Sequence, residues 1–333
     1  MNAFEYVTAE SFAAATTFLA DRPAGDTLVK AGGIDVLDRL KERLETPKRL
    51  LNLRDAMGPG NRIAEIGQHG IDIVLSATTT LAAIANHTAI RQRYPALAQA
   101  AEHAATPQIR NVATLGGNLC QKPRCWYYRS RDYDCLKKGG ATCYAVHGDN
   151  RYHAIFGAGA CHIVHPSSLA VPLLAYDAWL RLLKHEAGKL HQRKVSLDDF
   201  FRVPANPQQD ENVLEPGELI FEVFLPFQKN LRPRSAYVEL REKQSFDWPM
   251  VSCAVNLNDG AKPRVVLGAV APIPWRLKRV EALLADQKLT DALGDKAKAV
   301  ATRDANPMSL NRYKVQLAGV ALERALRQAD QEA

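Results

Sequence analysis

Residues 109–125 read IRNVATLGGNLCQKPRC, in which a glycine pair is followed directly by the first of several closely spaced cysteines. Five of the six cysteines fall between positions 120 and 161, at Cys120, Cys125, Cys135, Cys143 and Cys161. Cysteines gathered this closely serve ligand chemistry more often than packing. Cys253 stands alone in an apolar stretch, where we expect it to be a core residue.

The composition is that of an ordinary globular protein. The 333 residues are 47% hydrophobic and 24% charged, and the chain is long enough for two or three domains. No apolar run approaches the roughly 20 residues that span a bilayer, so we expect no membrane insertion. The first residues, MNAFEYVTAESF, lack the pattern of a signal peptide. The default expectation is a reducing cytoplasm, where clustered cysteines more often bind metal than form disulfides.

The net charge is +7, and a basic, aromatic stretch overlaps the cysteines. Between positions 121 and 138 there are six Lys or Arg residues against two Asp, interleaved with Trp and Tyr. This pattern is typical of nucleic-acid binding, and a zinc-stabilised nucleic-acid-binding protein is the alternative from a different class. The other interpretation is that the cations hold metal-binding thiolates deprotonated. We favour the second because the cations coincide with the cysteines, and we expect no nucleic-acid partner.

The periodicity of the first 227 residues indicates alternating helices and strands. Residues 1–55 read as a small α/β unit. The expected helices lie at about 9–20, after Gly33, from 78 to 85 and from 167 to 175; the expected strands lie at 27–30, 49–53, within 61–75, at 152–157 and at 219–225.

A polar stretch ending in proline, QKNLRP at 228–233, predicts a domain boundary. Beyond it we expect strands at 236–241, 251–257 and 265–270, and then helices, the last over about 309–329. In that helix, Leu310, Tyr313, Leu317 and Val320 are predicted to share one face with Ala321. Strands followed by helices are typical of an α+β module.

Two glycine pairs suggest close approach of the backbone to a ligand. They are Ala31-Gly32-Gly33 after a predicted strand and Thr114–Asn118, TLGGN, before the cysteines. Consecutive N–H groups in such turns form anion-binding nests. Neither loop matches G-x-G-x-x-G or the P-loop. Each alone is explained by a tight turn without a ligand, but together they favour a cofactor that carries a pyrophosphate.

The spacings between the cysteines are x4, x9, x7 and x17. No C-x2-C pair occurs, so zinc ribbons and C2H2 fingers are poorly matched. Four thiolates from an irregular loop suffice for a cubane iron–sulfur cluster. A purely structural cysteine loop is the third interpretation.

These residues together resemble a known family. The matching motifs are KAGG at 30–33, TTL at 79–81, IRNVATLGGN at 109–118, HPSS-LA at 165–170 and GAVAPIPWR at 268–276. The chain resembles the FAD-binding subunits of molybdenum hydroxylases, the xanthine dehydrogenase and aldehyde oxidoreductase family. The inserted cysteines are similar to those of flavoprotein subunits with an extra 4Fe–4S cluster, found in periplasmic aldehyde oxidoreductase and 4-hydroxybenzoyl-CoA reductase.

The resemblance implies an α+β fold of two domains. A vanillyl-alcohol-oxidase-type FAD-binding domain would cover residues 1–227, divided into α/β subdomains at 1–55 and 56–227, with the iron–sulfur loop at 119–165. A carbon monoxide dehydrogenase flavoprotein-type α+β domain would cover 228–333. The isoalloxazine ring would lie between the two domains.

The resemblance also implies which residues hold FAD. The first loop and the TLGGN loop would bind the pyrophosphate, and the implied set is Leu28, Val29, Lys30, Ala31, Gly32, Gly33, Ile34, Asp35, Val36, Thr106, Ile109, Thr114, Gly116, Gly117, Asn118, Ser168, Ile220 and Lys243. Three positions depart from the family pattern. Ile34 replaces a small hydroxyl residue, Ser168 replaces an aspartate near FAD, and Glu239 replaces a cation, which leaves Lys243 as a candidate flavin contact.

For the 4Fe–4S cluster, Cys125, Cys135 and Cys143 match the family in spacing and neighbours. The fourth ligand is predicted to be Cys161, as in the aldehyde oxidoreductase type, with Cys120 as the alternative. The coenzyme A reductases place that cysteine where this chain has Tyr152.

The activity implied is that of an oxidoreductase subunit without catalytic acid–base residues of its own. Electrons from a molybdenum-cofactor subunit that oxidises aldehydes or N-heterocycles would pass through a 2Fe–2S subunit to FAD and an external acceptor. The partners would form a heterotrimer or a dimer of heterotrimers. The alternative is a 4-hydroxybenzoyl-CoA reductase-like complex with electrons flowing towards molybdenum. The cytoplasm remains the default location, and export of the folded complex to the periplasm on a partner's twin-arginine signal is the alternative. These motifs do not specify the substrate or the acceptor.

Overall fold

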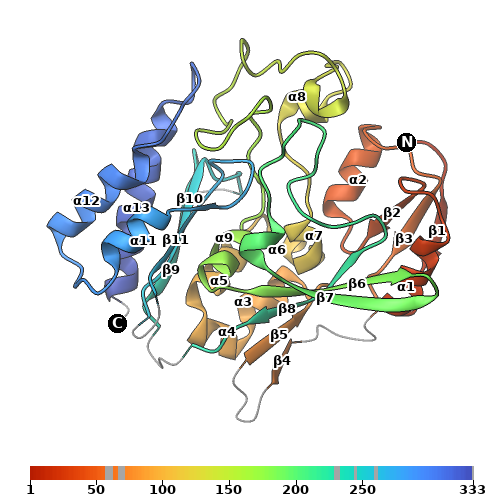
Figure 1. Ribbon diagram of the computed structural model, residues 1–333, viewed down its shortest axis with the longest axis horizontal. Coiled ribbons are helices and arrows are strands. Elements are labelled where there is room, and N and C mark those ends of the chain that lie inside the picture. Colours follow the sequence, from red (N-terminus) through yellow and green to blue (C-terminus); the bar gives the residue numbers. More distant parts are fainter. Residues whose placement is uncertain (57–62, 67–71, 229–232, 244–245, 259–261, 332–333) are drawn as a thin grey trace.

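The computed structural model describes residues 1–56, 63–66, 72–228, 233–243, 246–258 and 262–331. The chain begins with a parallel sheet and two helices (Figure 1). Its elements are β1 (Glu5–Thr8), α1 (Phe12–Ala20), β2 (Thr27–Lys30), α2 (Ile34–Lys41) and β3 (Arg49–Asn52). The sheet order is β1-β3-β2, with both pairs parallel, so helices make the crossovers. The predicted helix at 9–20 starts later because Ser11, whose hydroxyl accepts from the N–H of Ala14, caps it.

The second subdomain is built on a five-stranded antiparallel sheet in the order β4-β5-β8-β6-β7. Its strands are β4 (Ile63–Ile66), β5 (Asp72–Ser76), β6 (Trp179–Glu186), β7 (Lys189–Ser196) and β8 (Leu219–Leu225). Its helices are α3 (Leu81–Asn86), α4 (Thr88–Arg93), α5 (Pro95–His103), α6 (Pro107–Arg110), α7 (Leu115–Leu119), α9 (Ala170–Ala175) and α10 (Leu197–Phe200). The predicted strand at 219–225 is confirmed; positions 61–62 and 67–71 of the strand-like stretch lie outside the described residues.

The C-terminal part has a four-stranded antiparallel sheet in the order β12-β11-β10-β9, with helices against it at the left of Figure 1. The elements are β9 (Ser235–Leu240), β10 (Val251–Asn256), β11 (Arg264–Gly268), β12 (Trp275–Arg276), α11 (Lys278–Leu284), α12 (Asp291–Thr302) and α13 (Tyr313–Gln331). Cys253 is fully buried in β10, as predicted. Most of the predicted boundary, residues 229–232, lies outside the described residues.

Two expectations were wrong. Residues 152–157 form no strand: the N–H groups of Ile155 and Phe156 both donate to the Val270 carbonyl, and both side chains enter the core of the C-terminal part. The last helix also begins at Tyr313 rather than at about 309, so Leu310 precedes it, although Ala321 is buried as part of the core. Leu310 and Tyr313 are exposed, whereas Lys314 is buried, because its ammonium group finds carbonyl partners inside.

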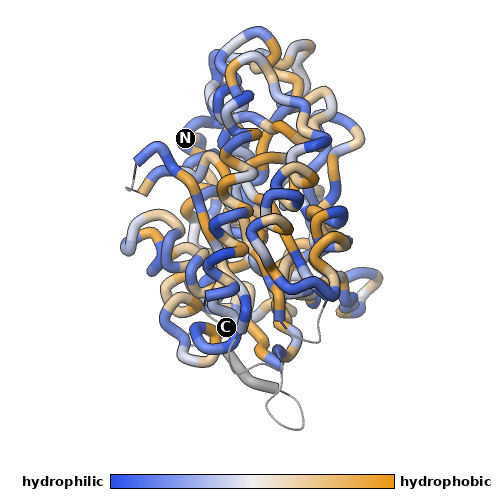
Figure 2. The backbone as a smooth tube through the Cα atoms, turned by 90° about the vertical axis from the view of Figure 1, so that its left-hand side faces the viewer, coloured by the Kyte–Doolittle hydropathy of each residue, from blue (hydrophilic) through white to orange (hydrophobic). Residues whose placement is uncertain are grey.

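Apolar packing forms one large core that joins the FAD-type half to Tyr237, Ala254 and Val266 of the C-terminal sheet, and a second core in the C-terminal part. A small third cluster comprises Val36, Leu40 and Leu50. Figure 2 shows apolar segments running through the interior of the chain trace, with hydrophilic residues interspersed. The cysteine segment contains α8 (Trp126–Arg129) and the 3-10 turn η1 (Leu136–Lys138), and it lies between α2 and the C-terminal part (Figure 1). No helix among the described residues is long and apolar enough to cross a membrane.

Candidate functional site

The two glycine loops lie against each other. A Cβ atom added to Gly32 would stand 2.2 Å from the carbonyl oxygen of Val112, just before the TLGGN loop. Gly33 has φ +85°, a left-handed conformation that favours glycine, and it is the N-cap of α2. In the described part of the chain, the N–H groups of Gly32 and Gly33 donate to no protein acceptor. This is the arrangement of an anion-binding nest.

A cavity opens in front of these N–H groups. Most of the residues predicted to hold FAD line it: Val29, Lys30, Ala31, Gly32, Gly33, Ile34, Asp35, Val36, Ile109, Thr114, Gly117, Asn118 and Ser168. Asn118 is oriented by its Oδ1, which accepts from the Ser167 hydroxyl at 2.6 Å. The assignment of these residues to FAD stays a prediction.

The other predicted residues lie outside this first cavity. Leu28 is within β2, and the Thr106 hydroxyl caps α6 by accepting from the N–H of Ile109 at 3.3 Å. Gly116 packs against Ala77, to whose carbonyl its N–H donates at 2.8 Å. Ile220 is buried in β8, and Lys243 borders a neighbouring cavity.

That second cavity lies between the cysteine segment and the C-terminal part, and it continues the first. The two share Arg124, Pro166, Ser168, Asp247, Trp248 and Pro249. Sequence reasoning missed the contribution of residues 246–249, since only Glu239 and Lys243 of the preceding stretch were considered. The signal in the sequence is the pair of aromatic residues Phe246 and Trp248, which are exposed in the structure.

Four cysteines surround a third, small cavity. Cys125, Cys135, Cys143 and Cys161 all line it, whereas Cys120 lines the first cavity instead. Cys125 borders both this cavity and the second one. All six cysteines are free thiols. Among the described residues, no group of three or more His, Cys, Asp or Glu side chains is arranged to hold a single metal ion. A cubane binds each thiolate through a different iron, so its sulfur atoms lie further apart than those around one ion.

The thiols interact electrostatically across this cavity. Burial raises the pKa of Cys125 to about 12, the N–H groups of Tyr128 and Tyr127 lower it, and the Cys161 and Cys135 sulfurs raise it further. Burial likewise raises the pKa of Cys161 to about 11, and Cys143 and Cys135 add to this. The pKa of Cys120 is also raised to about 12 by burial, but its charged neighbours are Lys122, Asp210, Arg39 and Asp35, with no other cysteine among them. His153 Nε2 lies 3.3 Å from Cys125 Sγ, and burial lowers the pKa of His153 to about 4, so the imidazole is neutral.

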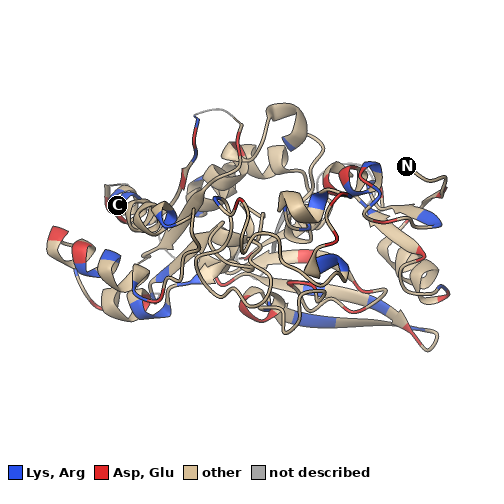
Figure 3. Ribbon diagram, turned by 90° about the horizontal axis from the view of Figure 1, so that it is seen from above, with Lys and Arg blue, Asp and Glu red and all other residues tan. Residues whose placement is uncertain are grey.

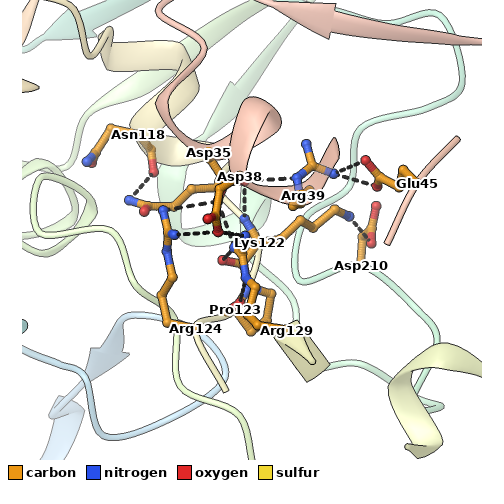
Figure 4. Close-up of polar contacts among 11 residues, drawn as sticks. Asp35, Asp38, Arg39, Glu45, Asn118, Lys122, Pro123, Arg124, Arg129 and Asp210 are labelled. Atoms are coloured by element: carbon orange, nitrogen blue, oxygen red, sulfur yellow. Dashed lines mark hydrogen bonds and ion pairs between the residues drawn. The ribbon is translucent and has the colours of Figure 1, made fainter. Parts of the chain in front are cut away.

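An ionic network joins the first glycine loop to the cysteine segment (Figure 4). Asp35, in the first turn of α2, lies 2.7 Å from Arg129 Nη2 and 3.1 Å from both Arg39 Nε and Arg124 Nη2. It also accepts from the N–H of Lys122 at 3.1 Å. Burial alone would raise the pKa of this carboxyl, but the three guanidinium charges outweigh burial and lower it.

Carboxylates neutralise most of the basic segment. Lys122 pairs with Asp210, and Lys137, which is buried, pairs with Glu211. Arg124 and Arg129 pair with α2. Blue and red segments are accordingly interspersed in Figure 3. The cations that suggested a nucleic-acid surface in the sequence are therefore mainly internal partners of acidic side chains.

Residues 2–228 match the family model described as the FAD binding domain in molybdopterin dehydrogenase. The chain belongs to this family. Residues 235–329 of this FAD-binding family member match the carbon monoxide dehydrogenase flavoprotein C-terminal domain. The predicted α+β fold class is thereby confirmed, and the chain is an oxidoreductase subunit.

Two relatives and one solved structure cover nearly the whole FAD-binding chain. The FAD-binding subunit PaoB of aldehyde oxidoreductase from Escherichia coli is 33% identical over all of both chains. The carbon monoxide dehydrogenase medium chain of Hydrogenophaga pseudoflava is 26% identical over 98% of this chain and 96% of its own. A chain in the crystal structure of the cyanide-inactivated Cu,Mo-CO dehydrogenase has a TM-score of 0.75 at 24% identity, covering 100% of this chain and 99% of its own.

Proposed function

We propose that the chain is the flavin- and iron–sulfur-containing electron-transfer subunit of a molybdenum hydroxylase complex that oxidises aldehydes or N-heterocycles. A molybdenum-cofactor subunit and a 2Fe–2S subunit are its partners in a heterotrimer or a dimer of heterotrimers. FAD, when bound, supplies the redox chemistry, and this chain binds, orients and shields it. The single observation that carries the proposal is the arrangement of three adjoining cavities, of which the first has glycine N–H groups and the third has four cysteines.

The glycine loops fit the pyrophosphate of FAD. Two N–H groups without protein acceptors face a cavity, and a side chain on Gly32 would fill the space between the loops. The second cavity, bounded by both domains, fits the isoalloxazine ring. Lys243 and Ser168 border it and are the candidate polar contacts of the ring. Ile34 lines the first cavity with an apolar side chain, and Thr106 and Ile220 lie outside that cavity.

A 4Fe–4S cluster fits the cysteine cavity, with Cys125, Cys135, Cys143 and Cys161 as ligands. Cys161 is preferred to Cys120 because Cys120 borders the flavin side and lacks thiol neighbours. The N–H groups of Tyr127 and Tyr128 point at Cys125 and would stabilise its thiolate. The position of the fourth cysteine also favours the aldehyde oxidoreductase type over the coenzyme A reductase type, since Tyr152 donates to Glu242 instead.

Metal and flavin analysis of the complex purified without oxygen tests this proposal. We expect one FAD per chain and a loss of about four iron atoms in Cys135→Ser, measured as a difference so that iron of a 2Fe–2S partner cancels. Cys120→Ser and Cys253→Ser are matched controls that should keep the iron. Zinc in place of iron, or full iron in Cys135→Ser, would contradict the cluster.

Substrate assays on the assembled complex test the direction of electron flow. Oxidation of aldehydes or N-heterocycles with a dye acceptor is expected. Reduction of an aromatic coenzyme A thioester by a strong donor, without aldehyde oxidation, would favour the reductase alternative. Release of the complex from the periplasm by osmotic shock would identify it as a passenger of a twin-arginine signal; retention would place it in the cytoplasm.

A further inference from the structure

Arg124 occupies the junction of the two cavities assigned to the flavin. Arg124 and Asp247 are the charged residues that border both the first and the second cavity. Arg124 also precedes Cys125, which borders the cysteine cavity. Its guanidinium lies over the ring of Trp248, 4.9 Å from the ring centre. Arg124 was missed from the sequence, where it was counted as one of several cations beside the cysteines.

The charge of Arg124 is less fully compensated than that of its neighbour Arg129. Both approach the same two carboxylates, but Arg129 lies 2.7 Å from Asp35 and 2.9 Å from Asp38, whereas Arg124 lies 3.1 and 3.4 Å away. Arg129 also donates to the carbonyls of Lys122 and Pro123 at 2.8 Å. By contrast, Nε of Arg124 is buried without a hydrogen-bond acceptor.

The other cations around the first glycine loop have protein acceptors. Lys30 donates to Asn52 Oδ1 at 3.0 Å and to the Ala31 carbonyl at 3.3 Å. Arg39 pairs with Glu45 as well as Asp35, although its Nε, like that of Arg124, is buried without a hydrogen-bond acceptor. Arg124 therefore differs from Lys30 and Arg39 in bordering both cavities. A guanidinium is well suited to phosphate because its planar donors match two phosphate oxygens.

We propose that Arg124 is a cofactor-binding residue whose guanidinium binds the pyrophosphate of FAD, with Asp35 as the positioning residue that holds it at the cavity wall. The inference rests on the proposed function. The glycine N–H groups approach the phosphates from one loop, and Arg124 approaches from the cysteine segment. Binding of FAD and the conformation of the segment beside Cys125 are thus linked through one side chain.

Titration of the flavin-free full chain with FAD and with ADP tests the inference. ADP carries the pyrophosphate without the isoalloxazine ring. In Arg124→Gln we expect both dissociation constants to rise roughly 10- to 100-fold, as for loss of a hydrogen bond to a charged group. Arg124→Lys, which keeps the charge but not the planar donors, should lie between Arg124→Gln and the wild type. Iron content should stay unchanged.

Arg129→Lys is the matched comparison, since Arg129 binds the same carboxylates without bordering either cavity. Its affinity for FAD should equal that of the wild type. An unchanged affinity for FAD in Arg124→Gln, a loss for FAD but not ADP, or an equal loss in Arg129→Lys would each overturn the assignment. If Arg124→Gln does not fold, wild-type affinity for ADP in Arg124→Lys would overturn it. Failure of the wild type to bind FAD would refute the proposed function itself.

Discussion

Replacement of Gly32 by alanine tests the contact between the two loops. The added Cβ would lie 2.2 Å from the Val112 carbonyl oxygen, whereas Cβ atoms essentially never come closer than 3.0 Å to such neighbours. The two loop backbones must therefore move apart until this distance has grown by at least 0.8 Å, from 2.2 to 3.0 Å. Overpacking of this kind costs about 1–3 kcal/mol of unfolding free energy. The same shift displaces the N–H groups of the nest. Since a hydrogen bond to a charged group contributes about 1.5–3 kcal/mol, loss of one weakens FAD binding at least about tenfold.

Two measurements on Gly32→Ala separate these effects: urea unfolding without flavin, and fluorescence titration with FAD. Gly294→Ala is the control. Gly294 lies in α12 with nothing within 4 Å of an added Cβ, so its replacement should leave FAD affinity unchanged and keep or raise stability, because alanine is the better helix former. An FAD affinity of Gly32→Ala within about twofold of the wild type would refute the reasoning that close approach of the loops positions the cofactor.

Three further predictions concern buried charges. Asp35→Asn removes the carboxylate shared by three guanidinium groups and should lower the unfolding free energy in urea by about 3–5 kcal/mol; a loss below about 1 kcal/mol would contradict this. Lys137→Met should lower the unfolding free energy by about as much, because it leaves Glu211 buried and unpaired. The double variant with Glu211→Met should regain most of this stability. Equal losses in the single and the double variant would show that the unpaired carboxylate is not the cause. Burial lowers the pKa of Lys314 from 10.5 to about 7, so between these two pH values the unfolded chain holds more protons than the folded chain. The unfolding free energy should therefore rise with pH, by at most about 1.4 kcal/mol per pH unit. Lys314→Met should flatten this slope between pH 7 and 9, and an unchanged slope would contradict the prediction.

Elements with strong local signals were predictable from the sequence. The strand at 27–30 has its predicted bounds because β-favouring residues are bounded by turn residues. LIFEVFL at 219–225 is apolar except for Glu222 and pairs on both sides. The stretch YHAIFG at 152–157 has the same apolar appearance but no strand to pair with. Its backbone instead bonds to Val270, far away in the sequence. Pairing partners of this kind leave no local pattern.

The candidate site was predictable where a backbone feature marks it. Glycine pairs and clustered cysteines can be recognised in the sequence. In the structure the two glycine loops border one cavity, and four of the cysteines border another. Charged side chains cannot be recognised in this way, because their role depends on which carboxylate lies opposite. Arg124 and Arg129 look alike in the sequence, yet only Arg124 borders the cavities. Likewise, Lys314 lies on the buried face of its helix because carbonyl groups from residues 152, 153 and 269 surround its ammonium.

The cysteine segment depends on the rest of the molecule for its shape. Among its described residues, regular structure is limited to α8, η1 and one bridge between Cys135 and Thr142, so few local hydrogen bonds fix the positions of the cysteines. Three other regions hold it instead. Asp35 binds Arg129 from the FAD-binding half, Glu211 binds Lys137, and Asn311 Nδ2 of the C-terminal part donates to the carbonyls of His153 and Ala154 at 3.1 Å. The cysteine cavity is lined by residues of the cysteine segment alone, and both domains support that segment from outside. The second cavity, by contrast, is bounded by residues of both domains, so its shape depends on how the domains pack together.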